Sequence, residues 1–316
     1  MTSLLERAVR LKNHSKNSLR LLSVITLISA FSQVTLGGYV RSSESGLGCP
    51  DWPLCHGQII PPLEFHTLVE YSHRLNASLL MVLVVTLFFL CLTKFRLEKA
   101  TIRLSGVALA LVLSAAVLGG ITVLTELAWW IRLIHLSLAE LLIGSITAMV
   151  WLAFCNNRSS SVNTMGITTP YWRKKLWILS VGLFLLIISG SYMVGTGASS
   201  ACSTWPLCRG DWFPNGTMYA IHMGHRYIAG LMVLITALIV WSFIKNDGHI
   251  PAVKRVSMTL MHSIILQIVV GAVLVWGGFN PALKTIHLAL ATLLWIATIY
   301  MVSCIIQNNV AYSRDD

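Results

Sequence analysis

Four of the ten histidines recur in pairs when the first half of the sequence is compared with the second. His73 matches His225, and His135 matches His287; each stands near the beginning of a long apolar segment. A single histidine in such a segment is more often a packing or hydrogen-bonding residue. Two in each half, repeated at equivalent positions, favour a metal site instead.

The histidine pairs suit heme iron better than a bare metal ion. Zinc and copper usually take further nitrogen, sulfur or oxygen ligands, whereas two histidines on neighbouring helices can fill both axial positions of a heme. Basic residues near the histidines could pair with heme propionates, or alternatively extend to the membrane interface. These residues are Arg74, Arg132, Arg226 and Lys284.

Carboxylates distinguish the two halves. Glu70 stands one helical turn before His73, but its counterpart is His222. This difference predicts proton chemistry in the N-terminal half and electron storage in the C-terminal half. Glu140 lies deep in an apolar segment, opposite Thr292 in the repeat. We interpret Glu140 as a structural hydrogen-bonding residue, with a proton relay as the alternative.

Two cysteine pairs occupy equivalent loops, Cys49 and Cys55 in CPDWPLC, and Cys202 and Cys208 in CSTWPLC. We predict a disulfide within each pair, since both loops are expected to face an oxidising compartment. A zinc site is the alternative, but only His56 is adjacent as a further ligand. The other cysteines are interpreted as unreactive thiols, namely Cys91, Cys155 and Cys304.

The composition excludes a soluble globular protein. Apolar residues make up 55% of the chain and charged residues 11%, against about 25% charged in soluble domains. Eight apolar runs are long enough to cross a bilayer as helices, and they lack the alternation of a membrane β-barrel. They are roughly 21–40, 75–93, 104–124, 129–154, 176–195, 227–244, 256–277 and 285–306.

The positive charge indicates an orientation. The chain has 23 Lys+Arg against 12 Asp+Glu, and most of the basic residues lie in 1–20 and in alternate loops. In a soluble protein this excess would indicate nucleic acid; here it predicts that both termini are cytoplasmic. A cleaved signal peptide at 21–40 is the alternative, but the repeat counterpart of that segment lies in the middle of the chain.

The chain is an internal repeat. GGYVRSSESGLGCPDWPLCHG at 37–57 matches GSYMVGTGASSACSTWPLCRG at 190–210, and RLIHLSLA matches KTIHLALA. Each half has an even number of spans, so both halves enter from the same side. We predict two tandem four-helix bundles related by a pseudo-twofold axis, over 1–154 and 176–316, joined by a cytoplasmic linker at 155–175. Histidines without a match are expected at solvent or interface, namely His14, His56, His66, His249 and His262.

These motifs, with EYSHR at 70–74, resemble the heme A synthase (CtaA) family over essentially the whole chain. The resemblance implies a protein of the bacterial cell membrane, with heme sites near the outer face. It implies oxidation of the C8 methyl of heme O to the formyl group of heme A for cytochrome c oxidase, by two successive hydroxylations. It also implies heme O synthase, oxidase assembly proteins and an unidentified electron donor as partners, besides membrane lipid, and no nucleic acid.

Carried over by motif, the resemblance implies that His73 and His135 hold substrate heme O, with Glu70 as the catalytic carboxylate. It implies that His225 and His287 ligate a permanent heme b. Arg74 and Arg132 are expected beside heme O, and Arg226 and Lys284 beside heme b. The family often has Thr-Gly where this chain has Ser43 and Glu44.

Three rival functions fit parts of the pattern. A membrane dihaem b-type electron carrier would need hemes near both faces, whereas all four histidines are expected near one. A quinone-linked thiol oxidase would not need the four matched histidines. A heme-handling assembly factor would not need Glu70.

Overall fold

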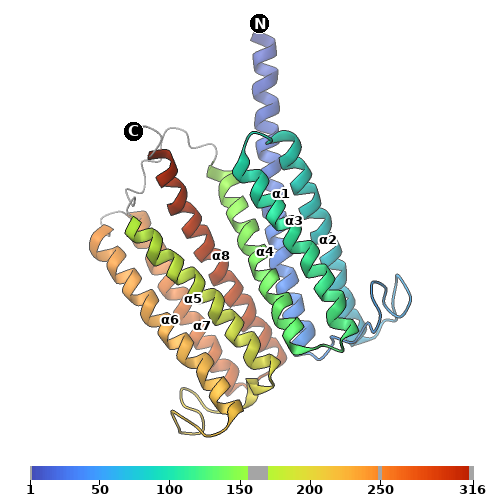
Figure 1. Cartoon of the computed structure of the whole chain (residues 1–316), viewed down its shortest axis with the longest axis vertical. Coiled ribbons are helices and arrows are strands. Elements are labelled where there is room, and N and C mark those ends of the chain that lie inside the picture. The colour runs from blue at the N-terminus through green and yellow to red at the C-terminus, as the bar shows by residue number, and fades with distance from the viewer. Residues whose placement is uncertain (1, 156–169, 248–250, 313–316) are drawn as a thin grey trace.

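The computed structural model describes residues 2–155, 170–247 and 251–312 of the 316-residue chain. Within this part the chain forms eight long α-helices and one short 3₁₀ helix, which confirms the all-helical prediction (Figure 1). Each α-helix has a segment long and apolar enough to cross a membrane. The helices are α1 (Thr2–Ser42), α2 (Phe65–Lys94), α3 (Lys99–Leu124), α4 (Trp129–Cys155), α5 (Pro170–Gly195), η1 (Ala198–Ser200), α6 (Thr217–Asp247), α7 (Pro251–Trp276) and α8 (Pro281–Tyr312).

Some expectations concern residues outside this description. They are the prediction for His249, those for the side chains of His14, Cys155 and Cys304, and most of the expected linker. Helix α5 begins at Pro170, so residues 170–175 of that expected linker are helical. Proline suits the first helical position because its fixed backbone angle fits a helix and it has no N–H to leave unpaired.

The helices pack as two groups of four. Helix α1 contacts α2 and α4, and α3 contacts the same two helices; α5 to α8 repeat this pattern (Figure 1). The groups meet through α1 with α8, α4 with α5, and α4 with α8. A twofold axis exchanges α1 with α5 and α4 with α8. It therefore converts the α1–α8 contact into the α4–α5 contact and leaves the α4–α8 contact unchanged, as observed.

Small residues permit the close approach of the two groups. A Cβ at Gly38 of α1 would lie 2.8 Å from the Leu288 side chain of α8, and one at Gly144 of α4 would lie 3.5 Å from Trp295 of α8. Small residues at helix contacts are common in membrane proteins, where close packing rather than water exclusion holds helices together. Buried apolar residues of both groups form one continuous core, which includes Val34, Ile143, Leu183 and Leu294.

The pseudo-twofold axis passes between α4 and α8. Glu140 and Thr292 are equivalent positions in the repeat, and Thr292 Oγ1 donates a hydrogen bond of 2.7 Å to Glu140 Oε1. Two positions related by a twofold axis can touch only beside that axis. Trp295 Nε1 donates to the Glu140 backbone oxygen at 2.8 Å, so both side chains on α8 bind the same residue of α4.

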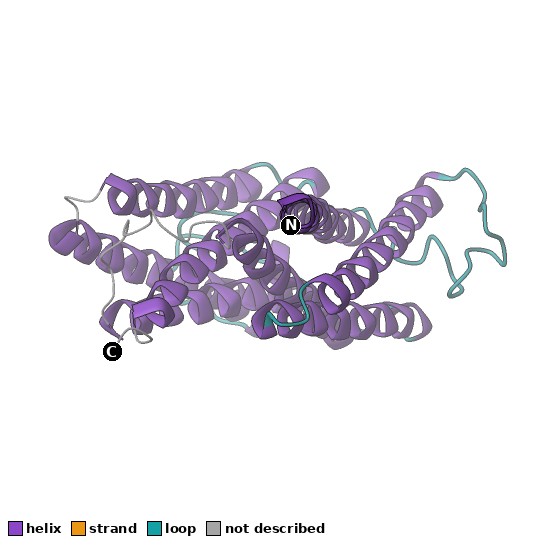
Figure 2. Cartoon of the chain, turned by 90° about the horizontal axis from the view of Figure 1, so that it is seen from above, coloured by secondary structure: helices purple, strands orange, loops and turns teal. Residues whose placement is uncertain are grey.

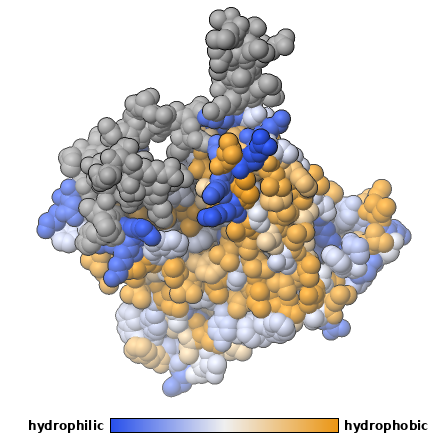
Figure 3. Space-filling model, turned by 45° about the horizontal axis from the view of Figure 1, so that its top comes forward, coloured by the Kyte–Doolittle hydropathy of each residue, from blue (hydrophilic) through white to orange (hydrophobic). Residues whose placement is uncertain are grey.

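The molecule has two distinct ends. The ends of α1 and α8 near the chain termini lie at one end, and the loops at 43–64 and 196–216 lie at the other (Figure 1). Seen from above, the helices run obliquely past one another and a long loop projects sideways (Figure 2). Apolar residues form a band over the visible sides of the helices (Figure 3). The chain is therefore a multi-pass membrane protein, and its orientation stays a prediction.

Candidate functional site

The four matched histidines lie on the even-numbered helices, in the part nearest the disulfide loops. Each imidazole rests against a glycine of a neighbouring odd-numbered helix. A Cβ added at the glycine would lie 2.9 to 3.4 Å from Cε1 of the ring. The pairs are His73 with Gly37, His135 with Gly119, His225 with Gly190, and His287 with Gly271. Sequence reasoning missed these glycines, although they match under the same repeat.

A cavity of about 720 Å³ adjoins the C-terminal pair. His225 and His287 both line it, among mostly apolar residues of α5 to α8. Protein pockets for cofactors are typically apolar, with a few polar groups that fix the orientation of the ligand. The cavity reaches the N-terminal half, because Gly38, Arg41 and Arg132 also line it.

The hydrogen bonds of His225 determine which ring nitrogen is available to a metal. Ser189 Oγ donates to the Leu186 backbone oxygen at 2.7 Å and lies 2.8 Å from His225 Nδ1. A hydroxyl carries one proton, so Nδ1–H of His225 must donate to Ser189. Nε2 then keeps its lone pair, which is the usual arrangement for a metal-ligating histidine with a hydrogen-bonded second nitrogen.

The residues around the C-terminal cavity therefore fit a heme. Two histidines from α6 and α8 line it, and His225 has a lone pair at Nε2. Several buried polar atoms of the cavity lining have no hydrogen-bond partner in the described chain, namely Arg41 Nε, Arg132 Nε and Gln267 Oε1. Unpartnered buried polar atoms are costly, and the polar groups of a ligand would remove that cost.

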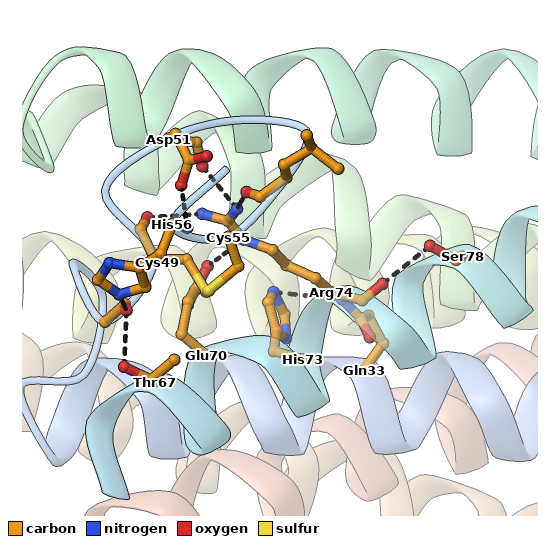
Figure 4. A network of polar contacts seen from close by, with 12 residues as sticks. Gln33, Cys49, Asp51, Cys55, His56, Thr67, Glu70, His73, Arg74 and Ser78 are labelled. Atoms are coloured by element: carbon orange, nitrogen blue, oxygen red, sulfur yellow. Dashed lines mark hydrogen bonds and ion pairs between the residues drawn. A yellow bond between two sulfur atoms is a disulfide. The ribbon is translucent and has the colours of Figure 1, made fainter. Parts of the chain in front are cut away.

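The N-terminal pair has a different polar environment. The amide nitrogen of Gln33 lies 3.2 Å from His73 Nε2, and Asn76 Nδ2 donates to Gln33 Oε1 at 2.7 Å (Figure 4). An amide nitrogen can only donate, so Gln33 occupies the Nε2 lone pair of His73. Nδ1 of His73 and Nδ1 of His135 are buried without a partner. The repeat equivalent of Gln33 is Leu186, and sequence reasoning did not single out Gln33.

Glu70 and Arg74 form a buried ion pair directed at the first disulfide loop. Arg74 Nε donates to Glu70 Oε1 at 2.9 Å, and Glu70 is only 5% exposed. The remaining nitrogens of Arg74 donate to loop carbonyl groups at 2.6 to 2.8 Å, those of Cys49, Asp51 and Leu54 (Figure 4). Arg74 thus fixes both the Glu70 carboxylate and the loop, where a propionate contact was expected.

Arg226 holds the second loop in the same way. It donates to the carbonyl oxygens of Thr204 at 2.8 Å and Cys202 at 3.3 Å, and its NH2 lies 3.0 Å from His222 Nε2. His222 replaces Glu70 as the partner of the arginine, and its Nδ1 bonds the Ala198 carbonyl at 2.9 Å. Arg226 also lines the cavity beside His225, as does Lys284.

Both predicted disulfides are present. Cys49 is bonded to Cys55 and Cys202 to Cys208, with Cα–Cα distances of 4.7 and 4.8 Å. Sulfur atoms joined in this way are not available as zinc thiolates, so the zinc alternative is wrong. Cys91 is a buried free thiol.

Polar contacts organise the first loop further. Asp51 accepts hydrogen bonds from the backbone amides of Gly57 at 2.7 Å and His56 at 2.6 Å. These bonds, the one from Gly57 first, hold the pKa of Asp51 below its ordinary value. Thr204 replaces Asp51 in the second loop, where its hydroxyl accepts from the Arg209 amide at 2.7 Å. The hydrogen-bonded loop shape is thus repeated, but the charge is not.

Other predicted residues have clear positions. His56, His66 and His262 are exposed, as expected for histidines without a match. Ser43 and Glu44 follow α1; Ser43 Oγ lies 2.8 Å from Ser45 Oγ, and Glu44 is an exposed residue at the edge of the cavity.

Comparison with known proteins agrees with this architecture. The model of the COX15-CtaA family, described as cytochrome oxidase assembly protein, matches residues 20–299. A heme A synthase from Exiguobacterium sp. is 28% identical over 261 residues, which cover 81% of this chain and 83% of the relative. The heme A synthase of Halalkalibacterium halodurans is 26% identical over 299 residues, or 92% and 98% of the two chains.

A third relative extends the likeness over nearly the full length. The heme A synthase of Shouchella clausii is 28% identical over 300 residues, which cover 92% of this chain and 98% of the relative. The matched region contains all four paired histidines, both cysteine pairs and Glu70. The chain therefore belongs to the cytochrome oxidase assembly (COX15-CtaA) family, the family of the heme A synthases.

Proposed function

We propose that this protein is a heme A synthase, which oxidises the C8 methyl of heme O to the formyl group of heme A for cytochrome c oxidase. The observation that carries the proposal is the repeated pair of glycine-backed histidines, with buried Glu70 one turn before His73 where His222 precedes His225. Family membership supports it, since the relatives are named heme A synthases.

The N-terminal half is proposed to bind the substrate, with His73 and His135 as axial ligands of heme O. Gln33 Nε2 lies 3.2 Å from His73 Nε2, as Gln267 Nε2 lies 3.4 Å from His287 Nε2, so a metal bound at either nitrogen has to replace an amide contact.

Glu70 is proposed to accept a proton during the oxidation of the methyl group. Oxidation of a methyl group to a formyl group removes hydrogen from the carbon, and a carboxylate near that carbon can carry a proton that is transferred in the process. Arg74 fixes the orientation of that carboxylate through its bond to Oε1. The backbone carbonyls of the first loop in turn fix Arg74, so the loop positions the base without contacting substrate.

The C-terminal half is proposed to hold heme b through His225 and His287, with Lys284 at the polar edge of the cavity. When bound, heme b supplies reversible one-electron transfer. The bond between Ser189 and Nδ1 would leave Nε2 of His225 as the ligand atom, and Gly190 leaves room for the ring.

We place the protein in the bacterial cell membrane, with the disulfide loops and both sites near the outer face. Its proposed partners are heme O synthase, oxidase assembly proteins and an electron donor that is not identified. All four histidines lie toward one end of the bundle, which argues against an electron carrier across the membrane.

Removal of a C-terminal ligand tests the heme b assignment. His225→Ala and His287→Ala should each purify with little heme b, because the iron loses one of its two axial bonds. Pyridine hemochrome spectra measure the heme content. Full heme b and an unchanged low-spin spectrum in either variant would show that the assignment is wrong.

Glu70→Gln tests the enzymatic step. The variant should retain its fold and heme b, but accumulate heme O or a partly oxidised product, because an amide cannot accept the proton at neutral pH. Chromatography of extracted hemes, compared with the wild type expressed in parallel, measures the products. Wild-type amounts of heme A would exclude a proton-transfer role for Glu70.

A further inference from the structure

Two arginines of the N-terminal half face the cavity of the C-terminal half. Arg41 lies in the last turn of α1 and Arg132 in the first turn of α4. Both line the cavity that His225 and His287 share. They reach it across the contacts of α1 with α8 and of α4 with α5, so the cavity is not enclosed by its own half alone.

Neither arginine has an anionic partner in the described chain. Arg41 donates to the hydroxyl of Ser191 at 3.3 Å and to its carbonyl oxygen at 3.1 Å, both uncharged groups. The Nε atoms of Arg41 and Arg132 are buried and form no hydrogen bond. Glu44 also lines the cavity, but it is exposed and forms no ion pair with them among the described residues. Buried charge without a counter-charge is strongly unfavourable.

The cavity has the polarity of a particular kind of ligand. Most of its lining is apolar, and the positive charge comes from Arg41, Arg132, Arg226 and Lys284. A heme has a broad apolar macrocycle and two propionates on one edge. Guanidinium groups bind carboxylates through paired, charge-assisted hydrogen bonds, and such bonds would satisfy the free Nε donors.

We propose that Arg41 and Arg132 bind the propionates of the heme whose iron His225 and His287 ligate. The inference rests on the proposed function, and it assigns Arg132 to heme b instead of heme O. The C-terminal site is then complete only when the N-terminal half is packed against it.

Comparison of the two repeats shows that the N-terminal half contributes a basic residue to the C-terminal cavity for which the C-terminal half has no equivalent. The equivalent of Arg41 is Val194, which carries no charge, and the equivalent of Arg132 is Lys284. The C-terminal half therefore has no arginine at the position that corresponds to Arg41. The heme in the C-terminal site is then held by basic residues of both halves, and the substrate heme by fewer basic residues. This difference agrees with a heme b that stays bound and a substrate heme that exchanges.

The test measures retention of heme b. Arg41→Gln and Arg132→Gln remove the charge but keep a polar side chain. Transfer of heme b from each purified variant to apomyoglobin should be about tenfold faster or more, since hydrogen bonds to charged groups have at least that effect on an equilibrium. The low-spin spectrum should be unchanged, because both histidines remain. Arg20→Gln is the matched control, since Arg20 lies on α1 but bonds the Ala153 carbonyl at the opposite end.

A ligand variant makes the test independent of folding. Heme b dimethyl ester has the same macrocycle without carboxylate charges. Apoprotein of the wild type should bind it at least tenfold more weakly than heme b, and the double variant should lose most of this preference. Equal binding of ester and heme b by the wild type, or wild-type transfer rates in both variants, would overturn the proposal. Retention of heme b by His225→Ala would instead overturn the proposed function.

Discussion

At the scale of single residues, glycine determines where each histidine ring can lie. Gly190 on α5 and Gly37 on α1 leave room for His225 and His73, with ring atoms 3.1 and 2.9 Å from where a Cβ would be. Real Cβ contacts are rarely so short, so even a methyl group must move the ring or separate the helices. The glycines are thus part of the sites, because they leave room for the histidine rings.

Gly190→Ala should therefore weaken heme b binding. Overpacking typically costs about 1–3 kcal/mol, which corresponds to roughly a 5- to 100-fold loss of affinity. Heme content after dialysis against apomyoglobin measures it. Gly224→Ala on α6 is the control, because a Cβ at that position meets nothing within 4 Å. Equal heme retention in Gly190→Ala and Gly224→Ala would contradict the steric role of Gly190.

Asp51 should make the first loop sensitive to acid. Its pKa is lowered from 3.8, mainly by the amide of Gly57. A depressed pKa stabilises the folded loop above the unfolded value, and this contribution is lost as the pH falls through the folded one. Hydrogen-exchange protection of the Gly57 and His56 amides should thus decrease below about pH 4. Asp51→Asn should lack this pH dependence; the same acid response in the variant would assign it to another group.

At the scale of elements, each disulfide loop is held by an arginine as well as by its cystine. Arg226 on α6 donates to carbonyl groups of the second loop, and Arg74 on α2 does so in the first. The two kinds of restraint are independent, because one is a covalent bond within the loop and the other joins the loop to a helix. Loss of one leaves the other in place.

Replacement of Cys202 and Cys208 by serine should consequently have a modest effect. A disulfide that closes so short a loop restricts the unfolded chain only a little, and its benefit varies from about 0 to 5 kcal/mol. We expect a lower apparent melting temperature and partial loss of heme b, with enzymatic activity retained. Activity and heme content of the double variant in parallel with wild type are the measurements; complete inactivity would indicate a redox role for the cystine.

At the scale of the whole molecule, Glu140 of the first half binds Thr292 and Trp295 of the second half beside the pseudo-twofold axis. Glu140 is fully buried and accepts from Thr292, and its second oxygen has no partner in the described chain. Elsewhere the interface combines apolar side chains and glycines with hydrogen bonds from Arg41 to Ser191 and between Ser42 and Thr285. The contact agrees with the structural interpretation of Glu140, while the proton-relay alternative stays untested.

Thr292→Val should destabilise the packing of the halves. It removes the hydrogen bond to a buried carboxyl group, at a cost of roughly 1–3 kcal/mol. Adding Glu140→Leu should recover part of the loss, because no polar group is then left without a partner. Apparent melting temperatures in detergent compare the single and double variants. A double variant less stable than Thr292→Val would show that Glu140 stabilises the interface by other contacts.

Much of this architecture could be predicted because it depends on local patterns. Runs of about 20 apolar residues predict helices, since lipid offers no hydrogen bonds to the backbone. The repeat paired His73 with His225 and Cys49 with Cys202 before any contact was known. Boundaries were less accurate: α1 extends from Thr2 and α5 from Pro170, because polar residues also continue helices beyond the membrane.

The partners of the basic residues could not be predicted in this way. Arg74 and Arg226 neighbour the histidines in sequence, but their side chains extend to the loop carbonyls. Successive residues on a helix point about 100° apart. A residue that follows a heme-ligating histidine in the sequence therefore need not contact the same heme. Gln33 and Gly190 were missed for the related reason that they lie on the helices facing the histidines.

By itself the sequence determined the eight membrane helices, the twofold repeat, the disulfide pairing and the family. These follow from composition and from matches along one chain. The tertiary structure alone decided that Arg41 and Arg132 enter the cavity of the opposite half. The physical reason is that a cavity is formed by surfaces of several packed helices. Its charge depends on which faces of α1 and α4 turn toward α5 and α8, and that rotation results from side-chain packing across the interface.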